Sequence, residues 1–218
     1  MMTQTVFIGL ACVAAYLLGS IPSSVWIGKF FFGIDVREHG SGNAGATNTL
    51  RTLGKKAGFS VLFIDFLKGF VATNIVFWQN MLTDSPYLLE YKMLLGGFAV
   101  LGHIYPVFAG FKGGKGIATL IGVVGGMDWR LAISCFLIFV IIVAISKFIS
   151  LGSILSGLLS PLVAGLIHDW QEMNLVYFCS IVGLLVTYTH RANIKRLIEG
   201  NENKFSLNKK PTQVNYKA

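Results

Sequence analysis

The stretch WRLAISCFLIFVIIVAISK (residues 129–147) decides the fold, because it is apolar over nearly its whole length. A helix needs about 20 such residues to cross the hydrocarbon core of a bilayer. Seven apolar segments of this kind, including this one, run roughly over residues 5–28, 58–79, 92–109, 115–127, 129–147, 150–168 and 173–189. Unpaired backbone groups are costly in hydrocarbon, so we expect each segment to be helical. The sequence predicts an all-α integral membrane protein with seven transmembrane helices.

The composition agrees with this fold class. Of 218 residues, 54% are hydrophobic and 13% are charged, whereas soluble domains carry about 25% charged residues. Three cysteines lie inside apolar runs without the spacing of a disulfide or zinc site (Cys12, Cys135 and Cys179). We expect residues 1–200 to form a single transmembrane domain, without a cleavable signal peptide, and residues 201–218 to form a polar cytoplasmic tail.

Two of the segments have unusual features. Residues 92–109 and 115–127 are short and interrupted by glycines, so they are candidates for re-entrant segments or half-helices. Prolines inside the apolar runs predict kinks at Pro22, Pro106 and Pro161.

The distribution of Lys and Arg predicts the orientation. With the N-terminus outside, fourteen of these residues fall on the inner side, and only Lys92 and Arg130 fall on the outer side. The net charge of +8 therefore fits orientation in a bilayer better than binding to nucleic acid. This orientation places three polar, cation-bearing interruptions on the cytoplasmic side.

The first interruption is SGNAGATNTLR (Ser41–Arg51). Glycines allow positive φ and close approach of the backbone, so successive N–H groups can form an anion-binding concavity. Hydroxyl, amide and guanidinium groups can complete the coordination of a phosphate. An ordinary solvated loop is the alternative. The candidate ligands are Ser41, Gly42, Asn43, Gly45, Thr47, Asn48 and Arg51.

The second interruption is GFKGGKGIAT (Gly110–Thr119). It fails the Walker A pattern, because Ala109 stands where the first glycine belongs and Gly116 follows Lys115 where Ser or Thr is needed. A glycine-rich turn that opens an apolar helix can still offer N–H groups to a phosphate. The candidate ligands are Gly113, Gly114, Lys115 and Gly116. A tight turn that anchors the chain on the inner side is the alternative.

The third interruption is HRANIKRL (His190–Leu197), which follows the seventh segment. If the helix continues, His190 and Asn193 share a face. Cations at a helix C-terminus also favour the helix dipole, which explains Arg191 and Arg196 without a site but leaves His190 and Asn193 unexplained.

Other polar residues lie within or beside the apolar segments. Asp65 and Lys68 are spaced as i and i+3, so they form either a structural ion pair or part of a site. His103 is more typical of a packing histidine. Ser153 is a candidate phosphate ligand, with helix capping as the alternative.

Taken together, these segments resemble the bacterial acyl-phosphate:glycerol-3-phosphate acyltransferase family. The matching motifs are GSIPSS, SGNAGATNTLR, DFLKG, GHIYPVFAGFKGGKGIAT and HRANIKRLIEGNE, in order from Leu18 to Glu202. The resemblance implies an integral inner-membrane enzyme that transfers a fatty acyl group from acyl phosphate to glycerol 3-phosphate, giving lysophosphatidic acid. It also implies association with a soluble acyl-phosphate synthase, and substrate assistance in which a substrate phosphate takes the proton.

The residues are consistent with this chemistry. No His is followed by Asp five positions later, so the His-x4-Asp dyad of soluble-type glycerolipid acyltransferases is absent. Lys115 with the Gly113–Gly116 backbone would hold one phosphate and stabilise transition-state charge. Arg51, the Ser41–Thr47 loop, His190 and Asn193 would hold glycerol phosphate. Whether His190 is a base or only a ligand stays open. We expect no cofactor and no metal.

Two other functions compete with this one. A phosphate-ester transporter would also place cations at helix breaks, but it should show inverted repeats and cations on the outer side. A metal-dependent lipid phosphotransferase needs clustered carboxylates, and Asp65 is the only acid deep in an apolar segment.

Overall fold

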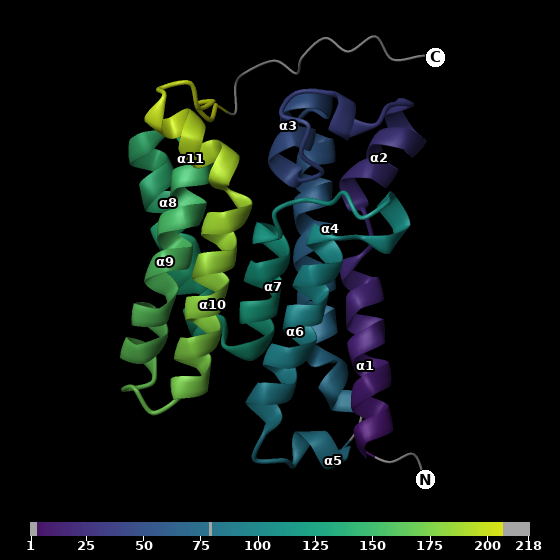
Figure 1. The fold of residues 1–218 in the computed structure, drawn as a ribbon, viewed down its shortest axis with the longest axis vertical. Coiled ribbons are helices and arrows are strands. Elements are labelled where there is room, and N and C mark those ends of the chain that lie inside the picture. Colours follow the sequence, from purple (N-terminus) through teal and green to yellow (C-terminus); the bar gives the residue numbers. More distant parts are fainter. Residues whose placement is uncertain (1–3, 79, 207–218) are drawn as a thin grey trace. The chain divides into compact units, whose positions relative to one another are not determined.

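A computed structural model describes residues 4–78 and 80–206, and all the regular structure in them is helical (Figure 1). The α-helices are α1 (Gln4–Gly19), α2 (Ser23–Phe32), α3 (Ala46–Leu53), α4 (Lys55–Thr73), α5 (Asn80–Thr83), α6 (Leu88–Ile104), α7 (Ile117–Met127), α8 (Trp129–Ser146), α9 (Ile149–Ile167), α10 (Met173–Thr189) and α11 (Arg191–Ile198). Short 3₁₀ turns occur at η1 (Val36–Glu38), η2 (Asn74–Trp78) and η3 (Val107–Ala109). The expectation of an all-α chain is confirmed for these residues. The predicted tail lies outside the described residues from 207 onward.

The contacts between helices fall into two compact parts, one extending to Gly126 and the other beginning at Met127. In the first part, α1, α4 and α6 pack against one another. In the second part, α9 packs against both α8 and α10, which are labelled beside it in Figure 1. The first and second polar interruptions belong to the first part, and the third belongs to the second.

Glycines let the helices of the first part approach backbone to backbone. A Cβ on Gly102 of α6 would overlap the carbonyl oxygen of Tyr16 in α1 and lie 2.8 Å from the Ser20 nitrogen. Similarly, a Cβ on Gly69 of α4 would overlap the carbonyl oxygen of Thr119 in α7. The helix spacing at these crossings therefore requires residues without side chains.

Prolines have different effects at different positions. Pro22 lies in the break between α1 and α2, which are bent by 42°. Pro106 follows the end of α6 and begins η3. Pro161 lies inside α9, and the helix continues through it.

Four helical stretches are long and apolar enough to cross a membrane: Lys55–Trp78, Leu88–Ala109, Trp129–Ser146 and Ile149–Ile167. The number rises to six if α1 with α2, and α10 with α11, each form one bent span. α7 has 11 residues, which give about 16 Å of helix, about half the thickness of the hydrocarbon core. All seven expected segments thus contain helix, and their length and composition support four to six spans among the described residues.

The close crossing of α1 and α6 predicts different outcomes for two glycines of α6. Gly102→Ala should lower the free energy of unfolding by about 1–3 kcal/mol, because the added methyl group forces the two backbones apart. Gly97 has nothing within 4 Å of its virtual Cβ, so Gly97→Ala should leave stability unchanged or raise it by about 0.5–1 kcal/mol. Thermal unfolding in detergent measures both. Equal melting temperatures for the two variants would contradict the crossing.

Candidate functional site

The first polar loop has a small apolar core that fixes it to its flanking helices. Val36, Leu53 and Ala57 are buried together, and three partly buried apolar side chains pack around them (Ile27, Phe32 and Ile34). These residues come from α2, its following turn, α3 and α4. The chain between α2 and α4 is therefore a folded structure on which polar groups can be positioned.

Asn48 organises the part of this loop that contains Ser41. Its amide group donates hydrogen bonds to the carbonyl oxygens of Val36 (2.8 Å) and His39 (3.0 Å). Its Oδ1 accepts from the backbone N–H and the hydroxyl of Ser41, at 2.8 and 3.1 Å. These four bonds use both donors and both lone pairs of the amide, and the residue is 2% exposed. In this structure Asn48 holds Ser41 in place, and binding of phosphate by Asn48 stays a prediction.

The other predicted residues of the first loop lie at or near its surface. Arg51 is in the last turn of α3, and Gly42 has a left-handed φ of 72°, which favours glycine. Ser41 and Gly42 are exposed, and the remaining candidates are half-buried (Asn43, Gly45, Thr47 and Arg51). These six residues stay candidates for phosphate binding.

The second polar loop folds back onto the end of α6. The N–H groups of Gly113 and Gly114 donate to the carbonyl oxygens of Ile104 (3.1 Å) and His103 (3.2 Å). In the structure these two N–H groups donate within the protein, and the binding of phosphate by Gly113 and Gly114 stays a prediction. A Cβ on Gly113 would overlap the His103 carbonyl oxygen, so this glycine is needed for close packing.

The end of the second loop has the features from which the sequence predicts phosphate binding. Lys115 is half-buried, and Gly116 has a φ of 83° just before α7 begins. The first N–H groups of a helix have no partner within it, and together with the helix dipole they favour an anion. Lys115, Gly116 and the start of α7 stay candidates for phosphate binding.

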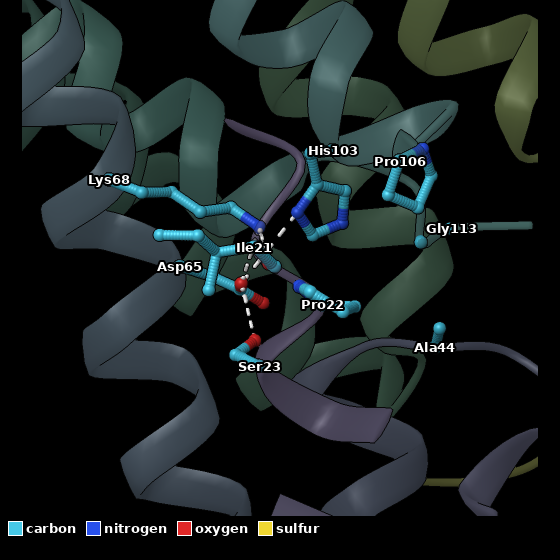
Figure 2. A pocket seen from close by; sticks show the side chains of 10 residues that line it. Ile21, Pro22, Ser23, Ala44, Asp65, Lys68, His103, Pro106 and Gly113 are labelled. Carbon is cyan, nitrogen blue, oxygen red and sulfur yellow. Dashed lines mark hydrogen bonds and ion pairs between the residues drawn. The ribbon is translucent and has the colours of Figure 1, made fainter. Parts of the chain in front are cut away.

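The two loops meet at Gly114. A Cβ on Gly114 would overlap His103 Nε2 and lie 2.9 Å from the carbonyl oxygen of Ala44, which belongs to the first loop. A pocket lies at this meeting point (Figure 2). Ala44, Gly113 and Gly114 line it, and so do buried polar side chains from α2, α4 and α6.

Asp65 is the centre of these buried polar side chains (Figure 2). Its Oδ1 accepts a hydrogen bond from the Ser23 hydroxyl at 2.7 Å and lies 2.9 Å from Lys68 Nζ. Lys68 also donates to the carbonyl oxygen of Ile21 at 3.0 Å, in the break between α1 and α2. The sequence left a structural pair and a site role open for Asp65 and Lys68, and the structure shows the ion pair.

His103 extends the same network toward α7. Its Nδ1 lies 3.7 Å from Asp65 Oδ1 and 3.1 Å from the Thr119 hydroxyl. All three residues are buried. The network thus connects the helix break, α4, α6 and α7 directly beneath the two loops.

The third polar segment belongs to the second part and bends at His190. Thr189 ends α10 and Arg191 begins α11, with 61° between the two helices, so the helix does not simply continue. The His190 ring is 3% exposed, and its Nδ1 is 2.8 Å from the carbonyl oxygen of Val186. A carbonyl oxygen only accepts, so Nδ1 carries the proton and the lone pair of the neutral ring is on Nε2.

Glu202 organises the third segment. Its Oε1 accepts from Asn193 Nδ2 (2.7 Å) and the Ser150 hydroxyl (3.1 Å). Its Oε2 accepts from Arg196 Nε at 2.8 Å. Burial opposes the charge of Glu202, but the hydrogen bonds from Asn193 and Arg196 outweigh it and lower the pKa of the carboxyl. Glu202 closes the HRANIKRLIEGNE motif but was not a candidate, because its polar surroundings suggested the start of a solvated tail.

Ser153 lies in the first turns of α9 and is 3% exposed. Its hydroxyl donates to the carbonyl oxygen of Ile149, one turn earlier in the same helix, at 3.0 Å. The residue does not cap α9, whose N-cap is Phe148. Binding of phosphate by Ser153 stays a prediction.

Comparison with known proteins places this arrangement in a family. Residues 9–200 match the family model described as glycerol-3-phosphate acyltransferase. The chain belongs to the glycerol-3-phosphate acyltransferase family. A family member from Listeria welshimeri is 43% identical over 201 residues, which make up 92% of this chain and 98% of that relative. A Bacillus subtilis member is 45% identical over 197 residues, 90% of this chain and 97% of the relative.

Solved structures of the family have the same fold. The crystal structure of PlsY, an integral membrane glycerol 3-phosphate acyltransferase, in its glycerol 3-phosphate form has a TM-score of 0.81 and 40% identity, covering 91% of this chain and 96% of that one. Its lysophosphatidic acid form has a TM-score of 0.78 and 38% identity, covering 92% and 96%. This acyltransferase-family chain is thus a multi-pass membrane protein.

The buried ion pair of this family member predicts a compensating double substitution. Lys68→Met should lower the free energy of unfolding by about 3–5 kcal/mol, because Asp65 keeps a buried charge without its cation. Adding Asp65→Asn should restore part of that loss. Thermal unfolding in detergent measures each variant.

The matched control is Lys29→Met, since Lys29 lies 3.3 Å from Asp35 with 55% of its side chain exposed. It should cost about 1 kcal/mol or less. A double variant less stable than Lys68→Met alone would contradict the compensation.

The lowered pKa of Glu202 predicts a pH-dependent contribution to stability. The folded carboxyl has a pKa below the ordinary value of 4.5, so its contribution is complete above about pH 4.5 and is lost as the pH falls through the folded value. Glu202→Gln should therefore be less stable than the original protein near neutral pH, with the difference shrinking in acid. Melting temperatures across that range measure it.

Glu199→Gln is the matched control, because Glu199 is exposed and its contact with Lys195 is 3.8 Å. This variant should follow the original protein at every pH. A Glu202→Gln variant that did the same would rule out the proposed role of the Glu202 contacts.

Proposed function

We propose that this protein transfers a fatty acyl group from acyl phosphate to the 1-hydroxyl of glycerol 3-phosphate. The products are lysophosphatidic acid and inorganic phosphate, as in the first step of membrane phospholipid synthesis. One observation carries the proposal: a solved relative, 40% identical over nearly the whole chain, is a glycerol 3-phosphate acyltransferase with a glycerol 3-phosphate form. The family match over residues 9–200 supports the same activity.

The polar segments suit an acyl phosphate donor. An acyl phosphate is a mixed anhydride, so its phosphate leaves with little help from an acid. The protein's tasks are then to hold two anions against their repulsion, place the hydroxyl at the carbonyl carbon, and stabilise the oxyanion. Cations and backbone donors are sufficient for these tasks. Among the described residues, no group of three or more His, Cys, Asp or Glu side chains could hold a metal ion.

We assign Lys115 to one of the two phosphates. It immediately precedes Gly116 and the N-terminus of α7, so its ammonium group and the first N–H groups of the helix would act on the same anion. This position also lets Lys115 stabilise charge that develops in the transition state. Gly113 and Gly114 contribute by allowing the loop to pack, because their own N–H groups donate to α6.

We assign glycerol 3-phosphate to Arg51 and to the loop that begins at Ser41, which Asn48 holds in place. His190 and Asn193 are assigned to the same substrate, with Ser153 as a further candidate. The hydroxyl proton of glycerol 3-phosphate would pass to a substrate phosphate, and His190 would bind and orient the substrate.

The finer topology is part of the proposal. Seven apolar segments, with the N-terminus outside, would place the three polar segments at the cytoplasmic face of the inner membrane. Phosphate substrates made in the cytoplasm would then reach the site directly, and a soluble acyl-phosphate synthase would associate there. The transporter alternative is not favoured, because the relatives are named as acyltransferases.

The donor specificity gives the first test of this function. Purified protein supplied with glycerol 3-phosphate should form lysophosphatidic acid from palmitoyl phosphate, and not from palmitoyl-CoA or palmitoyl-carrier protein. Product formation is followed by thin-layer chromatography with labelled glycerol 3-phosphate. Turnover with all three donors would remove the acyl phosphate assignment, and turnover with none would remove the proposed activity.

The residue assignments give the second test. Lys115→Ala, Arg51→Ala and His190→Ala should each lower turnover by about 30- to 1000-fold, the effect of losing roughly 2–4 kcal/mol of charge-assisted contact with a phosphate. The variants should still insert and fold. Ordinary kinetics in any one of them would exclude that residue from the site.

A further inference from the structure

Asp35 and Arg37 form a tight turn at the start of the first loop. Arg37 donates to Asp35 Oδ1 from its backbone N–H and from Nε, each at 3.0 Å. It also donates from Nη2 to Asp35 Oδ2 at 2.7 Å. The Arg37 guanidinium holds the pKa of the Asp35 carboxyl well below its usual range. Because the Nε and Nη2 edge of the guanidinium is held in this way, its remaining nitrogen, Nη1, points in a fixed direction.

Arg37 Nη1 reaches across to the second loop. It donates to the carbonyl oxygen of Ala109 at 2.8 Å and to that of Lys112 at 3.3 Å. These partners lie 72 and 75 residues away in the sequence. The Arg37 side chain thus joins the two polar loops of the first part. One of its partners, Lys112, lies three residues before Lys115.

The two carbonyl groups that Arg37 binds flank the most unusual backbone of the second loop. Gly110 has a φ of 64° and Phe111 a φ of 59°. Glycine adopts this left-handed region readily, but for a bulky residue such as phenylalanine it is disfavoured and needs support from its surroundings. Bonds to Ala109 and Lys112 hold the residues on either side of Gly110 and Phe111.

A second Asp-x-Arg turn in the chain shows that the hydrogen bonds from Arg37 to Ala109 and Lys112 are not a general feature of this motif. Asp128 and Arg130 repeat the Asp-x-Arg arrangement, with the Arg130 backbone N–H, Nε and Nη2 donating to Asp128 at 2.7, 3.3 and 3.1 Å. The Arg130 side chain is 51% exposed, and Asp128 is its only side-chain partner among residues 4–78 and 80–206. The Arg37 side chain is 23% exposed and bonds to the second loop in addition.

We propose that Arg37 is a positioning residue for the acyl transfer, which holds residues 109–112 in the conformation that presents Lys115 to a phosphate. The proposal rests on the proposed function and on the role of Lys115 within it. Asp35 orients the guanidinium, and the carbonyl oxygens of Ala109 and Lys112 in the second loop accept its hydrogen bonds. Lysine cannot replace the arginine, because one ammonium group cannot bind both carboxylate oxygens and both carbonyl oxygens at once.

Kinetics of matched arginine variants test the proposal. Arg37→Ala and Arg37→Lys should lower turnover by about 10- to 100-fold, the effect of displacing a catalytic group by about 1 Å. Arg130→Ala and Arg130→Lys lose the same kind of turn and should keep the original turnover. Loss of melting temperature should be similar in the Arg37 and Arg130 variants. If Arg37→Ala does not fold, Arg37→Lys carries the comparison. Original turnover in the Arg37 variants would overturn the proposal.

A double-mutant cycle separates positioning of Lys115 from general stabilisation. In a Lys115→Ala background, Arg37→Ala should change the residual turnover by less than about twofold, because the group it positions is already absent. A further loss as large as in the original background would overturn the proposal. Failure of the original protein to turn over acyl phosphate would instead refute the proposed function, so the two failures are distinguishable.

Discussion

A carboxylate buried between helices has to be paired, and in the first part of the chain this requirement falls on Asp65. In a low-dielectric interior an unpaired carboxylate costs several kcal/mol. Asp65 is paired with Lys68 and Ser23, and Lys68 in turn binds the carbonyl oxygen of Ile21. These contacts join α4 to the break between α1 and α2. The loops that carry Arg51 and Lys115 rest on the helices fixed in this way.

Above this network, each loop is ordered by hydrogen bonds within the protein. Asn48 uses its whole hydrogen-bonding capacity to hold Ser41, and the N–H groups of Gly113 and Gly114 are donated to α6. Arg37 then ties one loop to the other. In the second part Glu202 has a comparable role toward Asn193 and Arg196. The proposed binding of two anions would need such internal contacts, because cations and donors must stay in place when the reactants repel each other.

Several residues show why sequence patterns identified the polar loops but not the structural role of each residue in them. Asn48 lies in a glycine-rich, phosphate-suited motif, so pattern alone could not tell a ligand from a scaffold. Arg37 is bound to carbonyl oxygens 72 and 75 residues away, and nothing in its neighbouring sequence signals those partners. The local Asp-x-Arg pattern is the same at Arg130, which has no such partners among the described residues.

The sequence by itself determined that the chain is helical and membrane-embedded, because apolar segments of near-spanning length have few other stable structures in a bilayer. It also determined which three polar segments carry the phosphate-suited residues. Only the tertiary structure decided which N–H groups and side chains are already used inside the protein. Those partners are brought together by helix packing, through contacts such as Gly114 with Ala44 and His103, and packing between distant segments leaves no local pattern in the sequence.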